Sequence, residues 1–195
     1  MLLPVLGVLL AHHALSAGQG VTARPSAGTA AVLATTESPQ FRAPAELEAH
    51  ALRAWARGDS VTARREIAVA SAYRWLGQPY RWGGIGYDGI DCSALMRAAY
   101  RRAGMTLPRT SSEQARLGRE IGRVASQIVP ADLLVFGRGA RVTHVGMALG
   151  GGWFVHSAGN DRGVIVSRIA DPAWRRLWIG TRRVIEDAAR PEVAP

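Results

Sequence analysis

The first half of the chain carries apolar residues at the three- and four-residue spacing of amphipathic helices. The first stripe consists of Leu47, Ala51 and Trp55, between Pro44 and Gly58, which are residues that typically start and stop a helix. Later stripes end in the same way at a glycine, and Thr110 and Glu113 have the spacing of a capping box. The pattern predicts helices at 44–57, 59–76, 92–103 and 110–117.

From residue 118 onward the pattern changes. Short segments rich in Val, Ile and aromatic residues are separated by Gly, Asn, Asp or Pro, which is typical of strands. Helices followed by consecutive strands indicate an α+β domain with an antiparallel sheet, here of about five strands. The predicted strands are 133–136, 142–149, 153–157, 164–169 and 178–185.

The N-terminal residues differ in composition from the rest of the chain. Residues 2–10 are an apolar run too short to span a bilayer but long enough for the core of a secretory signal. Because no basic residue precedes Arg24, an incorrectly chosen start site or a short membrane-associated stretch remains an alternative. We expect a secreted or cell-envelope protein without a transmembrane span, divided into a signal peptide (1–17), a flexible linker (18–43), a helical extension (44–67), a catalytic domain (68–186) and a disordered tail (187–195).

Size and charge limit the classes of function. A chain of 195 residues has room for one well-buried domain with extensions, which we expect to act as a monomer. All 24 basic residues are arginine, so mechanisms based on lysine are excluded. The net charge of +9 favours acidic partners, but the arginines are spread along the chain. We therefore expect a solvated positive surface and no nucleic-acid partner.

Cys92 is the only cysteine and the strongest candidate for chemistry. It stands between Asp91 and Ser93, where a glycine-rich loop turns into a predicted helix. Unpaired N–H groups at the start of a helix lower the pKa of a thiol, which predicts a reactive nucleophile. The alternative is a small buried side chain, because Cys92 also heads the apolar stripe of that helix.

A thiol nucleophile needs a base, and histidine is the natural choice. His12 and His13 lie in the predicted signal peptide, and His50 is expected to face solvent in the middle of a helix. The remaining histidines, His144 and His156, lie on two consecutive predicted strands.

Hairpin register decides whether these two histidines can cooperate. If residues 150–152 form a three-residue glycine loop, Leu149 pairs with Trp153 and both histidines point to the same face, roughly 7 to 8 Å apart between backbones. A two-residue loop at 150–151 would place them on opposite faces. A zinc site is the other use for two histidines and a cysteine, but their spacing matches no common zinc motif, so we predict neither metal nor cofactor.

Several segments between about residue 68 and residue 185 follow, in order, the pattern of a known family. The quoted segments are Gly77-Gln78-Pro79-Tyr80-Arg81-Trp82-Gly83-Gly84, Asp91-Cys92-Ser93-Ala94-Leu95, Leu107-Pro108-Arg109-Thr110-Ser111, Pro130-Ala131-Asp132-Leu133-Leu134-Val135-Phe136, His144-Val145-Gly146 and Phe154-Val155-His156-Ser157-Ala158. Together they resemble the NlpC/P60 cysteine peptidases. The chain departs from the family pattern at Ala94 and Ala131, where glycine is usual. Neither change removes a catalytic group, although Ala94 could alter the fit beside the thiol.

The resemblance implies a papain-like fold and cleavage of peptidoglycan stem peptides, most often between D-γ-glutamate and a diamino acid. By position, Cys92 would be the nucleophile, His144 the base and His156 the residue that orients the base. Tyr80 would lie near the thiol and help to hold the oxyanion. Asp91 and Ser93 would line the pocket for the amino end of the stem peptide.

Three other functions remain open at the level of sequence. The same pocket could bind stem peptides without cleaving them. The same triad could serve an acyltransferase or an amidase that acts on other γ-glutamyl or isopeptide bonds. It could also belong to an antibacterial toxin that is delivered to a competitor.

Overall fold

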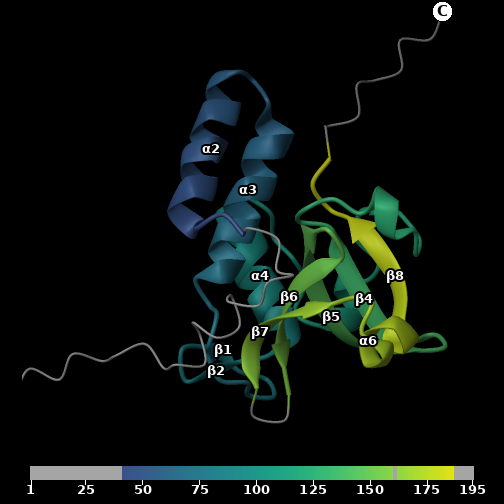
Figure 1. The fold of residues 1–195 in the computed structure, drawn as a ribbon. Helices are drawn as coiled ribbons and strands as arrows, with labels where there is room; N and C mark the ends of the chain where they lie inside the picture. Colours follow the sequence, from purple (N-terminus) through teal and green to yellow (C-terminus); the bar gives the residue numbers. More distant parts are fainter. Residues whose placement is uncertain (1–40, 160–161, 187–195) are drawn as a thin grey trace, which may run out of the picture.

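The computed structural model describes residues 41–159 and 162–186, and within them helices precede most of the strands (Figure 1). The predicted signal peptide, most of the predicted linker and the predicted tail at 187–195 lie outside these residues. No helix in the described ranges is long and apolar enough to cross a membrane. The helices are α2 (Pro44–Ala56), α3 (Ser60–Tyr73), α4 (Cys92–Arg102), α5 (Ser111–Gln114), the 3-10 helix η1 (Ala125–Gln127) and α6 (Pro172–Leu177).

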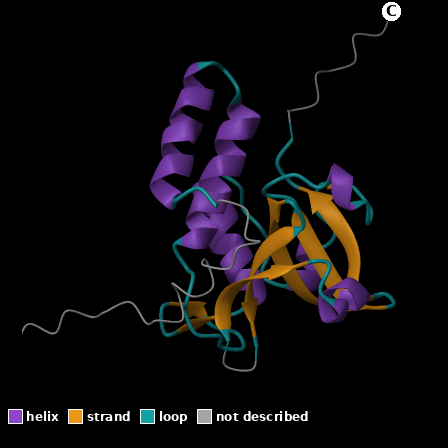
Figure 2. Cartoon of the chain, viewed as in Figure 1, coloured by secondary structure: helices purple, strands orange, loops and turns teal. Residues whose placement is uncertain are grey.

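The main sheet is antiparallel throughout, and its strand order is β3-β8-β4-β5-β6-β7 (Figure 2). All five predicted strands are present, and a two-residue strand at one edge adds a sixth. The predicted α+β class is confirmed. The strands are β3 (Arg119–Glu120), β4 (Leu133–Arg138), β5 (Arg141–Gly150), β6 (Trp153–Ala158), β7 (Gly163–Arg168) and β8 (Trp178–Arg183), and a small separate hairpin pairs β1 (Ile85–Gly86) with β2 (Gly89–Ile90).

Helix starts follow the capping signals in the sequence. Asp59 accepts a hydrogen bond from the Thr62 N–H at the start of α3, and Thr110 and Glu113 form the expected capping box at α5. Three details were predicted wrongly. α3 ends at Tyr73 and α5 ends at Gln114, and turns or bends follow each of them where further helix was predicted. Trp55 is 53% exposed, because α2 packs on α3 through Ala51 and Ala54, and Ala54 takes the buried place predicted for Trp55.

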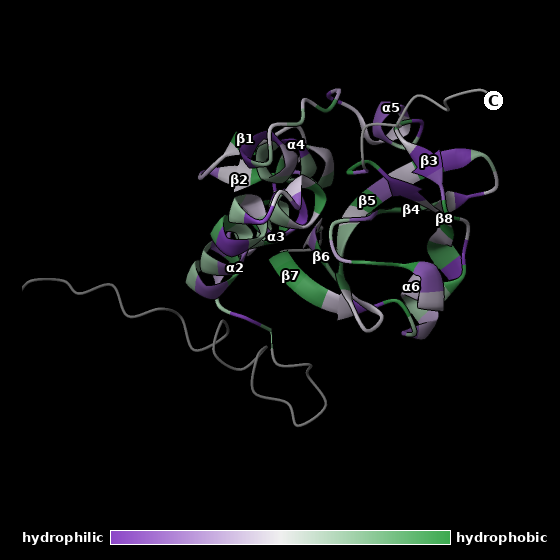
Figure 3. Ribbon diagram, turned by 90° about the horizontal axis from the view of Figure 1, so that it is seen from above, coloured by the Kyte–Doolittle hydropathy of each residue, from purple (hydrophilic) through white to green (hydrophobic). Residues whose placement is uncertain are grey.

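The two faces of the sheet pack against different helices. One face packs on α4, where Leu95 and Met96 belong to the same buried cluster as Val145 and Met147 of β5. The opposite face forms a second cluster that includes Phe136, with α6 packed against it. Figures 1 and 3 show α4 and α6 on different sides of the sheet. A side chain on β5 therefore points either toward the long helices or toward α6.

The loop from Gly77 to Ile90 is fastened to edge strand β7. The Gly77 N–H donates to the Val164 carbonyl at 2.9 Å, and the Val164 N–H donates to the Gln78 carbonyl at 2.8 Å. A Cβ on Gly163 would lie 2.2 Å from the Gln78 carbonyl oxygen, so only glycine permits this approach. The Ile90 N–H then donates to the Pro79 carbonyl at 3.0 Å, which fixes the end of the loop directly before α4.

Candidate active site

Cys92 occupies the first position of α4, as predicted, but its surroundings differ from the prediction. The side chain is 9% exposed. Burial raises the pKa of the thiol and outweighs the backbone N–H groups of Val145, Ser93 and Cys92 itself, which act in the opposite direction. The predicted lowering of the pKa by the helix start is therefore wrong for this structure, and the resting thiol is protonated.

The β5–β6 hairpin has the register needed for the histidines, but a bulge produces it and not the predicted loop. Met147 pairs with Val155 and Ala148 with Phe154, after which the register shifts and Gly150 pairs with Trp153. The predicted three-residue loop is wrong, because the turn contains only residues 151–152 and Leu149 is left as a bulge. A bulge adds one residue to one strand, as the longer loop would have done, so the register expected around the histidines is retained.

His144 and His156 are directly hydrogen-bonded. The distance between His144 Nε2 and His156 Nδ1 is 3.0 Å, and the two rings are nearly perpendicular at 89°. The other ring nitrogen of His156, Nε2, lies 2.9 Å from Ser167 Oγ on β7. Close strand approach requires glycine at position 146, because a Cβ there would lie 3.2 Å from the Cβ of His156 and 2.8 Å from Cδ2 of Phe154.

Aromatic rings enclose this pair on the face covered by α6. Trp174 stacks on His144 with ring centroids 5.3 Å apart and meets the edge of His156 at 4.6 Å. Phe154 stacks on His156 at 4.7 Å, and Phe136 lies 5.8 Å from His144. Burial lowers the pKa of His144 to about 4. It also lowers the pKa of His156, so both imidazoles are neutral at pH 7.

The sulfur contacts the backbone of β5 where the β5–β6 ladder ends. The pairing runs from Gly150–Trp153 only as far as Met147–Val155, and Val145, whose N–H contacts the sulfur, lies beyond it. Val145 directly follows His144 in the chain. Because Nε2 of His144 is engaged by His156, Nδ1 is the ring nitrogen left for a thiol.

Asp91 and Ser93 form a network with Arg109 around the start of α4. Arg109 donates to Asp91 Oδ2 at 2.6 Å and to Ser93 Oγ at 2.8 Å, and Ser93 donates to Asp91 Oδ1 at 2.8 Å. Asp91 also accepts the Ala94 N–H at 2.7 Å. Burial raises the pKa of Asp91, but these hydrogen bonds and the Arg109 charge outweigh it and lower the pKa overall. A substrate role for Asp91 and Ser93 stays a prediction, since both side chains are less than a tenth exposed.

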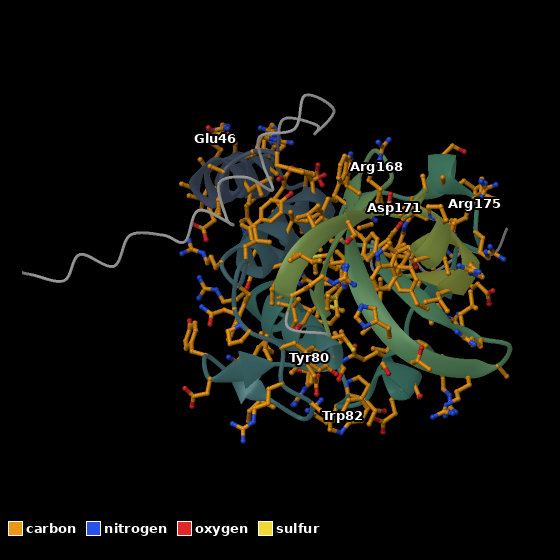
Figure 4. All side chains as sticks on the ribbon, turned by 60° about the horizontal axis from the view of Figure 1, so that its bottom comes forward. Glu46, Tyr80, Trp82, Arg168, Asp171 and Arg175 are labelled. Atoms are coloured by element: carbon orange, nitrogen blue, oxygen red, sulfur yellow. The ribbon has the colours of Figure 1, made fainter. Side chains whose placement is uncertain are left out.

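Tyr80 lies beside the start of α4 through a parallel bridge to Ile90. Burial, and then the negative charges that Cys92 and Asp91 can carry, raise the pKa of its phenol, so Tyr80 keeps its proton. Trp82, two residues further on, is 85% exposed. Figure 4 shows Tyr80 and Trp82 on the same side of the molecule, away from Arg168 and Asp171.

Two contacts with the histidines were not predicted from the sequence. Trp174 comes from α6, which was not predicted, although Asp171 followed by Pro172 is a recognisable helix start. Ser167 was treated only as part of a strand. Arg109 was noticed as a member of a motif, without a role.

His50 lies outside this site, and its predicted exposure to solvent is wrong. It is only partly exposed, because its Nδ1 lies 3.0 Å from Glu66 Oε1 on the neighbouring helix α3. Among residues 41–159 and 162–186, no three His, Cys, Asp or Glu side chains are grouped closely enough to hold a metal ion.

Comparisons with known proteins agree on one family. The sequence profile of the NlpC/P60 family matches residues 77–183. A probable endopeptidase NlpC homolog from Haemophilus influenzae is 38% identical over 120 residues, covering 60% of this chain and 62% of the relative. The murein DD-endopeptidase MepS/murein LD-carboxypeptidase from Escherichia coli is 38% identical over 112 residues, covering 57% and 58%.

Solved structures give the same result. An NlpC/P60 family protein from Bacillus cereus superposes with a TM-score of 0.59 at 29% identity, covering 63% of this chain and 40% of that one. The matched region spans about three fifths of the length of the two curated relatives.

Proposed function

The chain belongs to the NlpC/P60 family, and on that premise we propose that it is a cysteine peptidase that hydrolyses amide bonds in peptidoglycan stem peptides. Cys92 would be the nucleophile, His144 the base and His156 the residue that orients the base. The main support is the 3.0 Å hydrogen bond between the two imidazoles, next to the strand position that contacts the sulfur. The two curated relatives named above carry endopeptidase names.

The protonation states of the resting site determine how attack begins. The thiol and both imidazoles are neutral, so the mechanism does not start from a preformed thiolate. Nδ1 of His144 takes the thiol proton while the sulfur bonds to the amide carbon and the carbonyl oxygen becomes an oxyanion. The backbone N–H of Cys92 and the phenol of Tyr80 are the groups we expect to stabilise that oxyanion.

Three further proton transfers complete the reaction. The charged His144 gives its proton to the departing amine as the C–N bond breaks, which leaves a thioester on Cys92. His144 then removes a proton from water, and hydroxide adds to the thioester carbon. The C–S bond breaks, the sulfur recovers a proton, and the acid product leaves. His156 holds the His144 ring throughout and needs no negative charge to do so.

The bond we propose is the amide between D-γ-glutamate and the diamino acid, as the NlpC/P60 pattern of the sequence suggests. The Escherichia coli relative is named for DD-endopeptidase and LD-carboxypeptidase activities, which concern other bonds of the stem peptide. The new termini of the products distinguish these possibilities.

The test is digestion of purified muropeptides, followed by mass spectrometry of the products. The full chain should release a new amino terminus on the diamino acid, and Cys92→Ala should release none. Matched protein carrying Ser71→Ala, a small change at a buried residue of α3, should cleave normally. Equal cleavage by the Cys92→Ala protein would refute the assignment of the nucleophile.

A module that binds stem peptides without cleaving them is the second candidate. It is favoured by one observation, the nearly buried thiol with its raised pKa. Wild-type protein that retains muropeptides on a column but leaves them intact after long incubation would support binding alone. Cleavage that depends on Cys92 would exclude it.

A further inference from the structure

Ser167 contacts the candidate active site from a strand that supplies none of the proposed catalytic groups. It lies on β7, the edge strand of the sheet, and its backbone pairs with Phe154 of β6 (Figure 1). Its Oγ is 2.9 Å from Nε2 of His156. The side chain is half-buried, whereas His156 is completely buried.

Both ring nitrogens of His156 are therefore engaged by side chains. Nδ1 faces Nε2 of His144 and Nε2 faces the Ser167 hydroxyl. A neutral imidazole has one N–H donor and one acceptor nitrogen. The partner at one nitrogen consequently decides what the other nitrogen can do for its own partner.

Two arrangements of protons satisfy all three side chains. In the first, Ser167 accepts the Nε2–H of His156, so Nδ1 accepts the Nε2–H of His144 and Nδ1 of His144 has a free lone pair. In the second, Ser167 donates, each proton moves to the other ring nitrogen, and His144 presents an N–H at Nδ1. Only the first arrangement leaves His144 able to take a proton from the thiol.

We propose that Ser167 is a positioning residue whose hydroxyl oxygen accepts the Nε2–H of His156 and thereby holds His144 in its base-competent tautomer. The proposal rests on the proposed peptidase function. Because Ser167 is partly exposed, its own O–H can point to water while its oxygen serves the buried ring. The same arrangement also suits the charged His144 of the reaction, which donates from Nε2 without any change at His156 or Ser167.

Loss of this acceptor should reduce turnover more than substrate binding. In Ser167→Ala, a buried N–H of His156 has no partner, so the second tautomer becomes competitive. A wrong tautomer costs about 10⁴-fold in kcat in the triad of serine proteases. We expect a smaller loss, about 10- to 100-fold in kcat with KM nearly unchanged, because water can enter next to the alanine. Ser167→Thr keeps the hydroxyl and should recover most of the activity.

The decisive measurement is nitrogen NMR of the full chain labelled with ¹⁵N-histidine, at pH 7. Wild-type protein should show protonated Nε2 and unprotonated Nδ1 in both His144 and His156. Ser167→Ala should show a measurable population of the opposite tautomer, and Ser71→Ala, the same chemical change at a buried site on α3, should show none.

Three results would overturn the proposal: Nδ1–H on His156 in the wild type, an unchanged tautomer pattern in Ser167→Ala, or unchanged kcat in that variant of an active enzyme. The NMR readout does not depend on catalysis. If the wild type cleaves no muropeptide yet shows the expected tautomer change, the peptidase function fails while the role of Ser167 in setting the tautomer stands.

Discussion

The two halves of the candidate active site are stabilised by different physical means. Around the start of α4, Arg109 and Asp91 form an ion pair at 2.6 Å that also ties down Ser93. On the sheet, His144 and His156 are neutral and enclosed by aromatic rings. The helix half, made of Asp91, Ser93 and Arg109, depends on keeping its charges. The sheet half, made of His144, His156 and the rings around them, depends on excluding both charge and water. Changes of pH and of single residues should therefore separate the two halves.

Acidification should weaken the sheet half first. The pKa of His144 is about 4 in the folded protein and about 6.5 when unfolded. Below pH 6.5 the unfolded chain therefore binds a proton that the folded chain binds only near pH 4. The contribution of His144 to stability should be complete above pH 6.5, fall as the pH decreases, and be lost below about pH 4, while His156, whose pKa is also lowered by burial, adds to the decline. The loss from His144 is about 3 kcal/mol, measured by urea unfolding at a series of pH values.

The helix half should not respond over this range. Asp91 has a lowered pKa, so its contribution is present above its unfolded value of about 3.8 and is lost only as the pH falls through its still lower folded value. His144→Gln, which cannot gain the proton, serves as the control and should make the pH dependence between 6.5 and 4 shallower, leaving the part that comes from His156. An equally steep dependence in that variant would contradict the assignment to His144.

Removal of Arg109 should lower the free energy of unfolding slightly less than the protonation of His144 does. Arg109→Leu leaves the Asp91 carboxylate nearly buried and without its cation, which should cost about 2 kcal/mol after allowance for the partial exposure of the arginine. The matched change Arg119→Leu breaks a more exposed pair with Glu186 and should cost less than about 1 kcal/mol. Equal losses in thermal unfolding would show that the Asp91 network is no more important than a surface pair.

Gly146→Ala tests how tightly β5 packs against His156 and Phe154 of β6. The added methyl would lie 2.8 Å from Phe154 and 3.2 Å from the Cβ of His156, so His156 must shift relative to His144. Overpacking of this kind costs about 1 to 2 kcal/mol, and we expect a larger proportional loss of kcat. Gly180→Ala on β8 is the control, because its methyl would meet no atom within 4 Å. Normal kcat in Gly146→Ala would show that the His144–His156 distance is not critical.

The smallest effect in this series is expected from removal of the Trp174 ring that stacks on His144. In Trp174→Ala, water reaches the stacked face of His144, so its pKa should rise from about 4 by about one unit toward 6.5. Trp174→Phe keeps a ring over the imidazole and should shift the pKa less. Proton NMR titration of the His144 ring measures both variants, and identical pKa values in all three proteins would mean that other groups exclude the water.

The sequence predicted the helix half of the site better than the sheet half. Asp91, Cys92 and the start of α4 are encoded by neighbouring residues, and a cap next to an apolar stripe is visible locally. The strands were also found, because their apolar composition and turn residues are local signals. The register of His144 and His156 was expected correctly, but the bulge at Leu149 that produces it was not.

The remaining features depend on contacts between distant residues. A six-residue helix is too short to show a period, so neither α6 nor the position of Trp174 over His144 could be read from spacing. The pKa of Cys92 was predicted in the wrong direction for a similar reason. The helix start is a local feature, whereas the burial that outweighs it comes from packing between α4 and β5.

The enclosed, protonated sulfur has a consequence for chemical durability. Peroxide and related oxidants attack thiolates that solvent can reach, and in the resting protein the Cys92 thiol is protonated and nearly buried. The chain holds no second cysteine that could form a disulfide with an oxidised Cys92 and so rescue it. The burial and protonation of the Cys92 thiol should therefore slow its oxidation in the resting protein.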